Sequence, residues 1–439
     1  MFTTLKNALA NKDLRKKIFI VLGLLVLFRL GCWIPIPGIS VEVFKSQVEN
    51  QSFLQLLSGI TGGALTNGAI LALGVSPYIT AQIVVQLLSV VIPSWERLSK
   101  QGEEGRKKLT IYTKIFTLVL ALAQAIGIVV GFANQTFGEG ESIKYGLSNF
   151  MFGSQAVTGI VVVLVLVAGS MFTMWLGEKI TDTGIGNGLS LLIFVGILST
   201  AGTSIAAAFK NAISGADAMG WWKIIAFFVA LAIIFFMIVL MENSERKVPV
   251  QYAKQIKGRK MYGGQSTNIP IKMLASGVMP IIYAMSLLSF PQIIMSIFFP
   301  TSAAAQWYNT YMGAGSWAYS VVVAVLILAF AYFVSMMSFK PDEISRSIQS
   351  NGGFIPGIRP GKPTADYLNK INKRIVFFGA CFLAFLTIVP TLIFKAIGDT
   401  GLVSAFSATG MIIVVSVALE FNKQLEAQLL MKNYKGFLK

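Results

Sequence analysis

Two short patterns in the sequence contain residue types that could do chemistry. Residues 357–364 read GIRPGKPT, close to a phosphate-binding loop, and residues 188–191 read GLSL, a Gly-x-Ser pattern that can present a serine nucleophile. The first lacks the Gly-x4-Gly-Lys-Ser/Thr spacing and has Pro363 where a helix should begin. The second has no usual base, because the chain contains no histidine. We therefore expect no enzyme activity, no catalytic residue and no cofactor.

The elements that would have to position such groups are strongly apolar. Of the 439 residues, 55% are hydrophobic and 13% are charged, and the mean hydropathy is +0.70. Soluble globular proteins carry about 25% charged residues. The two cysteines, Cys32 and Cys381, lie in separate apolar runs, which favours packing over a disulfide or a metal site. The composition predicts an integral membrane protein.

Ten apolar runs approach or exceed the ~20 residues that cross a bilayer as a helix. They predict an all-α integral membrane protein with ten transmembrane helices, in which the basic start of the chain is not a cleavable signal. The predicted spans are Ile18–Ile34, Ala69–Ile92, Leu109–Ala133, Gly153–Leu176, Ile185–Phe209, Trp221–Met241, Lys272–Phe299, Trp317–Phe339, Ile375–Lys395 and Leu402–Phe421.

The basic residues are concentrated in alternate loops. The two termini and the loops on their side of the membrane hold 30 of the 36 Lys and Arg residues, the opposite loops hold five, and Arg29 lies within the first span. Because positive loops stay in the cytoplasm, both termini are predicted to be cytoplasmic. The net charge of +17 is then mainly a topology signal rather than a nucleic-acid footprint.

Two blocks of five spans would be inserted in opposite senses, which permits an inverted pseudo-repeat around a central path. The predicted organisation is a cytoplasmic tail (1–17), an N-terminal half (18–210), a C-terminal half (211–421) and a second cytoplasmic tail (422–439).

The cytoplasmic loops 242–272 and 340–374 are longer than a hairpin needs. Alternating apolar and polar residues predict a small β-hairpin in the first loop, and GGFIPGIRPG (352–361) predicts an ordered turn in the second. Long structured loops usually carry function. Either these loops dock a cytoplasmic partner, or their charge only fixes the topology.

Prolines interrupt the second span of each half. Pro77 in one and Pro280 and Pro291 in the other predict kinked or weakened helices. Arg29 and Lys114 are the main ionisable candidates within the spans, and no span centre has an acid, so ion coupling has little support. From these residues alone, a multi-pass small-solute secondary transporter ranks ahead of a channel or an intramembrane enzyme.

One segment fits none of these elements. Residues 53–68 read FLQLLSGITGGALTNG, which is apolar but too short to cross a bilayer. The glycines weaken a helix by roughly 1 kcal/mol each relative to alanine. The residues predict either a failed span or a re-entrant loop.

Four longer motifs resemble a known family. Residues 72–88 (ALGVSPYITAQIVVQLL), 181–194 (TDTGIGNGLSLLIF), 252–272 (YAKQIKGRKMYGGQSTNIPIK) and 352–364 (GGFIPGIRPGKPT) resemble the SecY/Sec61-alpha family. Its members are the large, channel-forming subunit of the Sec protein translocase. The resemblance implies two pseudo-symmetric inverted five-helix halves around a central pore. It also implies a channel that translocates unfolded secretory polypeptides across the bacterial plasma membrane and inserts membrane proteins laterally.

The resemblance also implies roles for particular residues. The implied pore ring is Val75, Ile79, Leu189, Ile193, Ile282 and Ile413. The 53–68 segment is implied to be a plug that closes the pore, through Phe53, Leu54, Leu57, Ile60, Gly62, Gly63 and Asn67. The implied lateral gate and signal-sequence path include Ile83, Gln86, Ser286 and Phe290. The implied docking residues for the SecA ATPase or the ribosome are Lys257, Arg259, Lys260 and Arg359.

The same resemblance implies the partners. These are SecE and SecG as further channel subunits, the SecA ATPase and the ribosome as sources of driving force, and signal peptides and translocating polypeptides as cargo. Anionic membrane lipids are expected to contact the basic cytoplasmic face.

Overall fold

The computed structural model describes residues 2–50, 54, 58–133, 136–137, 144–145, 147, 154–184, 186–213, 220–252, 255–257, 260–262, 266–274, 277, 279–298, 302, 307–308, 311–312, 316–397 and 408–436. Contacts divide the chain into two compact units. The first unit comprises Met1–Phe227, Met285–Ser320 and Thr391–Lys439, and the second comprises Phe228–Ala284 and Val321–Pro390.

The first unit is helical, with one short ladder between β1 (Thr136–Phe137) and β2 (Lys144–Tyr145). Its helices are α1 (Phe2–Ala10), α2 (Lys12–Gly31), α3 (Val41–Asn50), α5 (Ser76–Val91), α6 (Pro93–Lys100), α7 (Glu103–Ala133), α8 (Gln155–Asp182), α9 (Gly188–Ile213) and α17 (Ala408–Gly436). Several further helices contribute residues to both units, among them α10 (Gly220–Glu242), α11 (Met279–Phe298) and α15 (Lys362–Ile397).

Several described helices are long and apolar enough to cross a membrane. Six meet that test alone, and α5 with α6 forms a seventh candidate that is bent by 107° at Ile92 and Pro93. Proline cannot continue the helical hydrogen-bond ladder, which accounts for the break. Many of their large apolar side chains are exposed, as expected of helices that face lipid.

The predicted second span was wrong at its start. Residues 69–75 form turns, and the helix α5 begins only at Ser76. Pro77 therefore lies in the first turn of α5 rather than in mid-helix, where it would cause a kink. The first turn tolerates proline because its backbone N–H groups have no partner within the helix.

The predicted seventh span was wrong at its start in the same way. Lys272 belongs to a β-strand, and α11 begins at Met279, so that Pro280 lies in its first turn. Pro291 does lie inside α11, as the sequence indicates.

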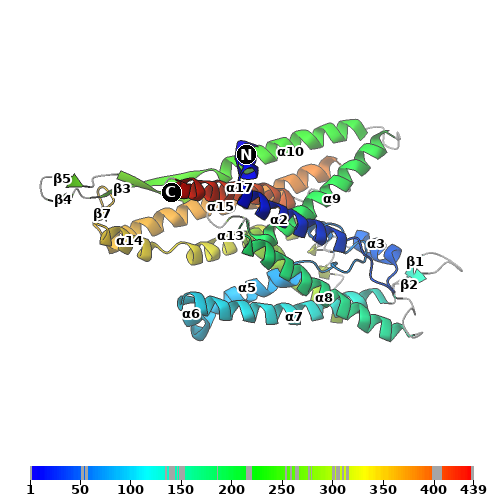
Figure 1. Ribbon diagram of the computed structural model, residues 1–439. Coiled ribbons are helices and arrows are strands. Elements are labelled where there is room, and N and C mark those ends of the chain that lie inside the picture. Colours follow the sequence, from blue (N-terminus) through cyan, green and yellow to red (C-terminus); the bar gives the residue numbers. More distant parts are fainter. Residues whose placement is uncertain are drawn as a thin grey trace. The chain divides into compact units, whose positions relative to one another are not determined.

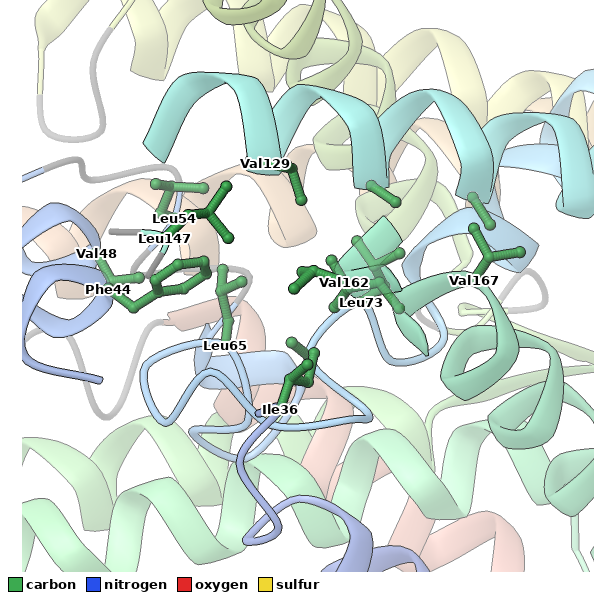
Figure 2. Close-up of a cluster of buried hydrophobic side chains, with 14 residues drawn as sticks. Ile36, Phe44, Val48, Leu54, Leu65, Leu73, Val129, Leu147, Val162 and Val167 are labelled. Atoms are coloured by element: carbon green, nitrogen blue, oxygen red, sulfur yellow. The ribbon is translucent and has the colours of Figure 1, made fainter. Parts of the chain in front are cut away.

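A buried apolar cluster in the first unit ties the 54–73 segment to three helices (Figure 2). It combines Leu54, Leu65 and Leu73 with side chains of α3, α7 and α8. Two of these, Phe44 on α3 and Val162 on α8, are 1% and 0% exposed. α7 also packs along α5 and α8 (Figure 1). Burial of apolar surface therefore anchors a segment that does not itself span the membrane.

The second unit contains α13 (Trp317–Ser338, whose first turn belongs to the first unit), α14 (Pro341–Ser350) and a three-stranded antiparallel sheet in the order β6-β3-β7. Its strands are β3 (Glu245–Tyr252), β6 (Ser266–Lys272) and β7 (Gly353–Phe354). A separate hairpin joins β4 (Gln255–Lys257) to β5 (Lys260–Tyr262). The predicted β-structure in the 242–272 loop is confirmed.

The sheet also joins two loops that are far apart in sequence. Gln251 and Tyr252 of β3 pair with Phe354 and Gly353 of β7. A single apolar core then forms beneath the sheet from both loops and from the first turns of α15. The buried members of this core are Val248, Val250, Ile271, Ile348, Ile355, Leu368 and Ile375.

Candidate functional site

The candidate site of the first unit is built around residues 58–68, the continuously described part of the glycine-rich segment. Residues 58–60 are helical, and the chain then runs through turns. Gly62 and Gly63 have φ of 71° and 84°, a left-handed conformation that other residues rarely adopt. The Gly63 N–H donates to the Ser58 carbonyl at 2.7 Å. These glycines allow the backbone to fold back on itself.

The C-terminal end of this segment is fixed to the residues that follow α2. Pro35 and Ala69 form an isolated β-bridge. The Ile36 N–H donates to the Gly68 carbonyl at 2.9 Å, and the Ile70 N–H donates to the Ile34 carbonyl at 3.0 Å. Asn67, one of the implied plug residues, therefore lies next to a short paired stretch.

Helix α9 approaches the segment at a glycine and a threonine one turn apart. A side chain at Gly196 would overlap the Ile60 carbonyl, so only glycine permits this approach. Thr200 Oγ1 lies 3.3 Å from the Gly59 carbonyl and 3.2 Å from the Gly196 carbonyl, and its hydroxyl can donate to either. The backbone of the segment thus packs directly on α9.

Helix α2 contacts the segment through two side-chain donors. Arg29 Nη1 donates to the Gly62 carbonyl at 2.8 Å, and Cys32 Sγ lies 3.6 Å from the Thr61 carbonyl. Hydrogen bonds from a charged donor are stronger than neutral ones. The segment is therefore held both by the C-terminal end of α2 and by α9.

The predicted plug residues lie in different surroundings. Leu54 is buried in the cluster with α3, α7 and α8, whereas Ile60 and Asn67 are half-buried. Phe53 and Leu57 lie outside the residues that the structure describes.

Five of the six predicted ring residues belong to the first unit. Val75 is buried at the N-cap of α5, and Ile79 is half-buried one turn later. Leu189 and Ile193 lie one turn apart on α9, with Ile193 buried. Ile413 is buried on α17, which packs against α9. The sixth, Ile282, is half-buried on α11 in the second unit. The ring as a whole stays a prediction.

The predicted gate residues lie on α5 and α11. Ile83 is buried and Gln86 is half-buried on α5, and Ser286 is half-buried on α11. The side chain of Phe290 lies outside the described part of the chain. Two residues after Ser286, the Leu288 carbonyl accepts a hydrogen bond from the hydroxyl of buried Tyr308 at 2.7 Å, and burial raises the pKa of Tyr308.

One ion pair among the described residues joins two helices of the first unit, α7 and α8. Lys114 Nζ on α7 and Glu178 Oε2 on α8 are 2.8 Å apart, and both side chains are partly exposed. Lys114, which the sequence marks as an ionisable residue inside a span, is thus neutralised by an acid near the end of α8.

The predicted docking residues belong to the two connected loops of the second unit. Lys257 and Lys260 face each other as backbone partners in the β4–β5 hairpin, and Arg259 lies outside the described residues. Arg359 is exposed on the turn between β7 and α15. Its carbonyl accepts from Thr364 Oγ1 at 2.9 Å, and Ser345 Oγ donates to the Gly361 carbonyl at 2.7 Å. The turn that presents Arg359 is therefore anchored at both sides.

Sequence reasoning missed a link between α17 and the 181–188 loop. The Gly186 N–H donates to Gln424 Oε1 at 2.6 Å, and Gln428 Nε2 donates to the Gly184 carbonyl. It also missed Gly196 and Thr200. Their spacing of four residues on a predicted helix was the only available signal, and it is a weak one.

The fold and the site first indicate the general class of protein, and the family comparison then narrows that class to one family. Apolar helices long enough to cross a membrane, a non-spanning segment packed on two of them, and structured loops make this chain a multi-pass membrane protein. The SecY family model matches residues 69–422, and the chain belongs to the SecY family.

Relatives agree with this assignment. The chain is 39% identical to the protein translocase subunit SecY of Streptomyces griseus over 452 residues, with 100% of both chains covered. It is similar in fold to a solved SecY channel described for its plug domain, with a TM-score of 0.64 and 20% identity over 94% of this chain and 91% of that one. The Sec61 of a canine ribosome-channel complex from the endoplasmic reticulum matches with a TM-score of 0.60 and 19% identity over 93% and 90% of the two chains. These channels are ten-helix membrane proteins. The transporter and enzyme alternatives have no support among these relatives.

Proposed function

We propose that this chain is the central subunit of a bacterial plasma-membrane channel that translocates unfolded polypeptides and releases transmembrane segments laterally into lipid. The observation that carries the proposal is the seating of the 58–68 segment on α2 and α9. On α9, Ile193 lies three residues before Gly196, so the two share one helix face. A predicted ring residue therefore lies on the helix face that the segment contacts.

An aliphatic ring suits this task. A narrow apolar constriction excludes water and ions when empty, and it has no fixed hydrogen-bonding groups that would select particular side chains. In a relative, the plug domain is described as stabilising the closed state and maintaining a membrane seal. The 53–68 segment is proposed to do the same here.

The inverted halves, with both termini in the cytoplasm, complete the proposed topology. The charge distribution supports this orientation, since 30 of the 36 basic residues fall on one side. Gln86 and Ser286 would then belong to a seam between α5 and α11 through which signal peptides and transmembrane segments reach the lipid. Hydrophobic burial would drive their exit.

The cytoplasmic loops are the proposed docking site for the SecA ATPase and the ribosome. A relative occurs in a ribosome-channel complex. The anchored turn at Arg359 and the basic β4–β5 hairpin offer positive charge to ribosomal RNA or to an acidic protein surface. Since we find no nucleotide-binding loop in the sequence, the driving force is assigned to these partners.

An apolar cavity supports the proposed small partner subunits. A cavity of about 400 Å³ lies between α1, α2, α9 and α17 and is lined by Ile18, Val21, Phe194 and Phe421 among others. We assign it to an apolar helix of SecE and place SecG at the periphery. Anionic lipids are proposed to contact the basic residues next to it, such as Lys12 and Lys16.

The decisive experiment is a crosslink to a substrate in transit. A secretory polypeptide that is arrested part-way and carries one cysteine should form a disulfide with Ile193→Cys. Leu198→Cys on the same helix is the control, because Leu198 is 52% exposed and should face away from the path. Equal crosslinking at both positions, or none at Ile193→Cys, would contradict the proposal.

A further inference from the structure

Arg29 is a cation in an unusual place. It lies near the end of α2, within a predicted span, and is half-buried. Among the described residues, no carboxylate lies within ion-pair distance of it, and its one hydrogen-bond partner there is the Gly62 carbonyl. A guanidinium cannot be deprotonated in a protein, so its charge must be satisfied by polar groups.

The Gly62 carbonyl is available to Arg29 because of the backbone at Gly62. With φ at 71°, the chain reverses there. A side chain at Gly62 would overlap Arg29 Nη1 and would also lie 3.0 Å from Gly196 Cα. A side chain at Gly62 would therefore disturb both the Arg29 contact and the contact with the α9 backbone.

Three carbonyls of the segment accept from side chains outside it. Those of Gly59, Thr61 and Gly62 face Thr200, Cys32 and Arg29 respectively. Only Arg29 is charged, and a bond from a charged donor contributes more than the other two. Removal of the segment would leave the Arg29 charge in an apolar helix bundle without its partner, which opposes displacement.

We propose that Arg29 is a positioning residue that holds the 58–68 segment in its seated state and so sets how often the empty channel opens. This inference rests on the proposed function and adds to it a residue outside the segment. The segment is short and rich in glycine, so it has little helical stability of its own. Its seated population then depends on these external contacts, with Arg29 as the strongest polar one.

The test measures seating and leakage separately in the purified membrane complex. Seating is followed by oxidation of an introduced cysteine pair, Gly59→Cys with Thr200→Cys, in a Cys32→Ser, Cys381→Ser background. Gly59 suits this purpose because a Cβ there would meet no atom within 4 Å. Leakage is the ion conductance of planar bilayers without substrate.

Arg29→Met should raise the unseated fraction about tenfold, because it removes one charge-assisted hydrogen bond. Disulfide formation should slow and resting conductance should rise. Arg29→Lys keeps the charge without the planar fork, and it should restore part of both signals. Lys210→Gln is the matched control: it removes one cation from the exposed end of α9 and should change neither.

Wild-type crosslinking and conductance in Arg29→Met would overturn the proposal, as would an equal effect of Lys210→Gln. If Arg29→Met does not accumulate, Arg29→Lys carries the test: it should slow disulfide formation and raise resting conductance by less than tenfold, and wild-type values of both signals would overturn the proposal. The crosslink reports seating whether or not the chain conducts. A protein that crosslinks normally but never conducts or binds substrate would contradict the channel function and leave the Arg29 contact standing.

Discussion

At the scale of single residues, the first unit depends on glycines that let backbones touch. Gly169 on α8 lies against the Ile70 carbonyl, and Gly196 on α9 lies against the Ile60 carbonyl. In each case a helix meets the irregular chain between residues 58 and 75. Helix association in membranes relies on such small residues, because lipid gives little hydrophobic driving force.

This packing predicts opposite effects for two helical glycines. Gly169→Ala places a Cβ on the Ile70 carbonyl and should destabilise the protein by about 1–3 kcal/mol. Gly131→Ala in α7 meets no atom within 4 Å and should be neutral, or stabilising by up to ~1 kcal/mol. The midpoint of thermal unfolding of the detergent-solubilised complex measures both. Equal midpoints for the two variants would contradict the packing at Gly169.

The sequence identifies Arg29 as a cation inside an apolar run, but it does not reveal the partner of that cation. A cation inside an apolar run is visible in the sequence, and Arg29 was an expected intramembrane candidate. Its partner is a backbone carbonyl, which has no sequence signature. The partner of Lys114 was easier in principle, because Glu178 is the acid at the end of a neighbouring span, yet nothing in the sequence fixes their distance.

At the scale of elements, two of the prolines predicted to kink helices lie instead at helix starts. Pro77 and Pro280 follow turns and lie at the starts of α5 and α11, whereas the hydropathy pattern had extended both helices backwards through apolar loop residues. Buried turns are as apolar as helices in this chain, since Ala69, Leu71, Ala72 and Leu73 are all buried. Hydropathy alone therefore could not locate these boundaries. Helix existence was predictable, and helix beginnings were not.

The sheet of the second unit was predictable only in part. Alternation in residues 248–252 indicates a strand, and its pairing with β6 within the same loop is local. The pairing with β7 joins loops separated by α11 and α13, and two residues per strand give no sequence signal. The consequence is that both predicted docking loops share one core.

This shared core predicts that one buried valine supports both loops. Val250 is fully buried, and Val250→Ala should cost about 2 kcal/mol. Amide hydrogen exchange in β6 and β7 should then speed up by about tenfold or more. Gln251→Ala is the control, because its side chain is exposed while its backbone pairs with both neighbours. Faster exchange in β6 alone would show that the loops are independent.

At the scale of the whole molecule, charge and apolar surface are separated along the chain. The helices present large exposed apolar side chains such as Trp222, Phe236 and Phe378, whereas the basic residues gather in loops and tails. This partition supports the proposed orientation, with both termini in the cytoplasm. It also concentrates positive charge on the proposed docking side. The contribution of a single basic residue there must therefore be distinguished from the effect of the general positive charge.

Charge reversal at two neighbouring positions can distinguish the specific role of Arg359 from the effect of the general positive charge. Arg359→Glu should strongly reduce secretion driven by SecA, while the variant protein still inserts into the membrane. Lys362→Glu changes the net charge equally at another exposed position, three residues away, and should have a small effect. Secretion of a reporter by membrane vesicles measures both. Equal losses would mean that general charge, rather than the anchored Arg359 turn, attracts the motor.

The short pairing between residues 34–36 and 68–70 has a consequence for the proposed plug and for how it would reclose the channel. The bond from Ile36 to Gly68 ties together the two ends of a loop that contains α3 and the seated segment. A displaced segment stays tethered, at an effective concentration on the order of millimolar near its own binding surface. Reclosure is then a first-order event within one chain, independent of how many channels the membrane contains. If the segment is the proposed plug, its seal resets itself after each polypeptide has passed.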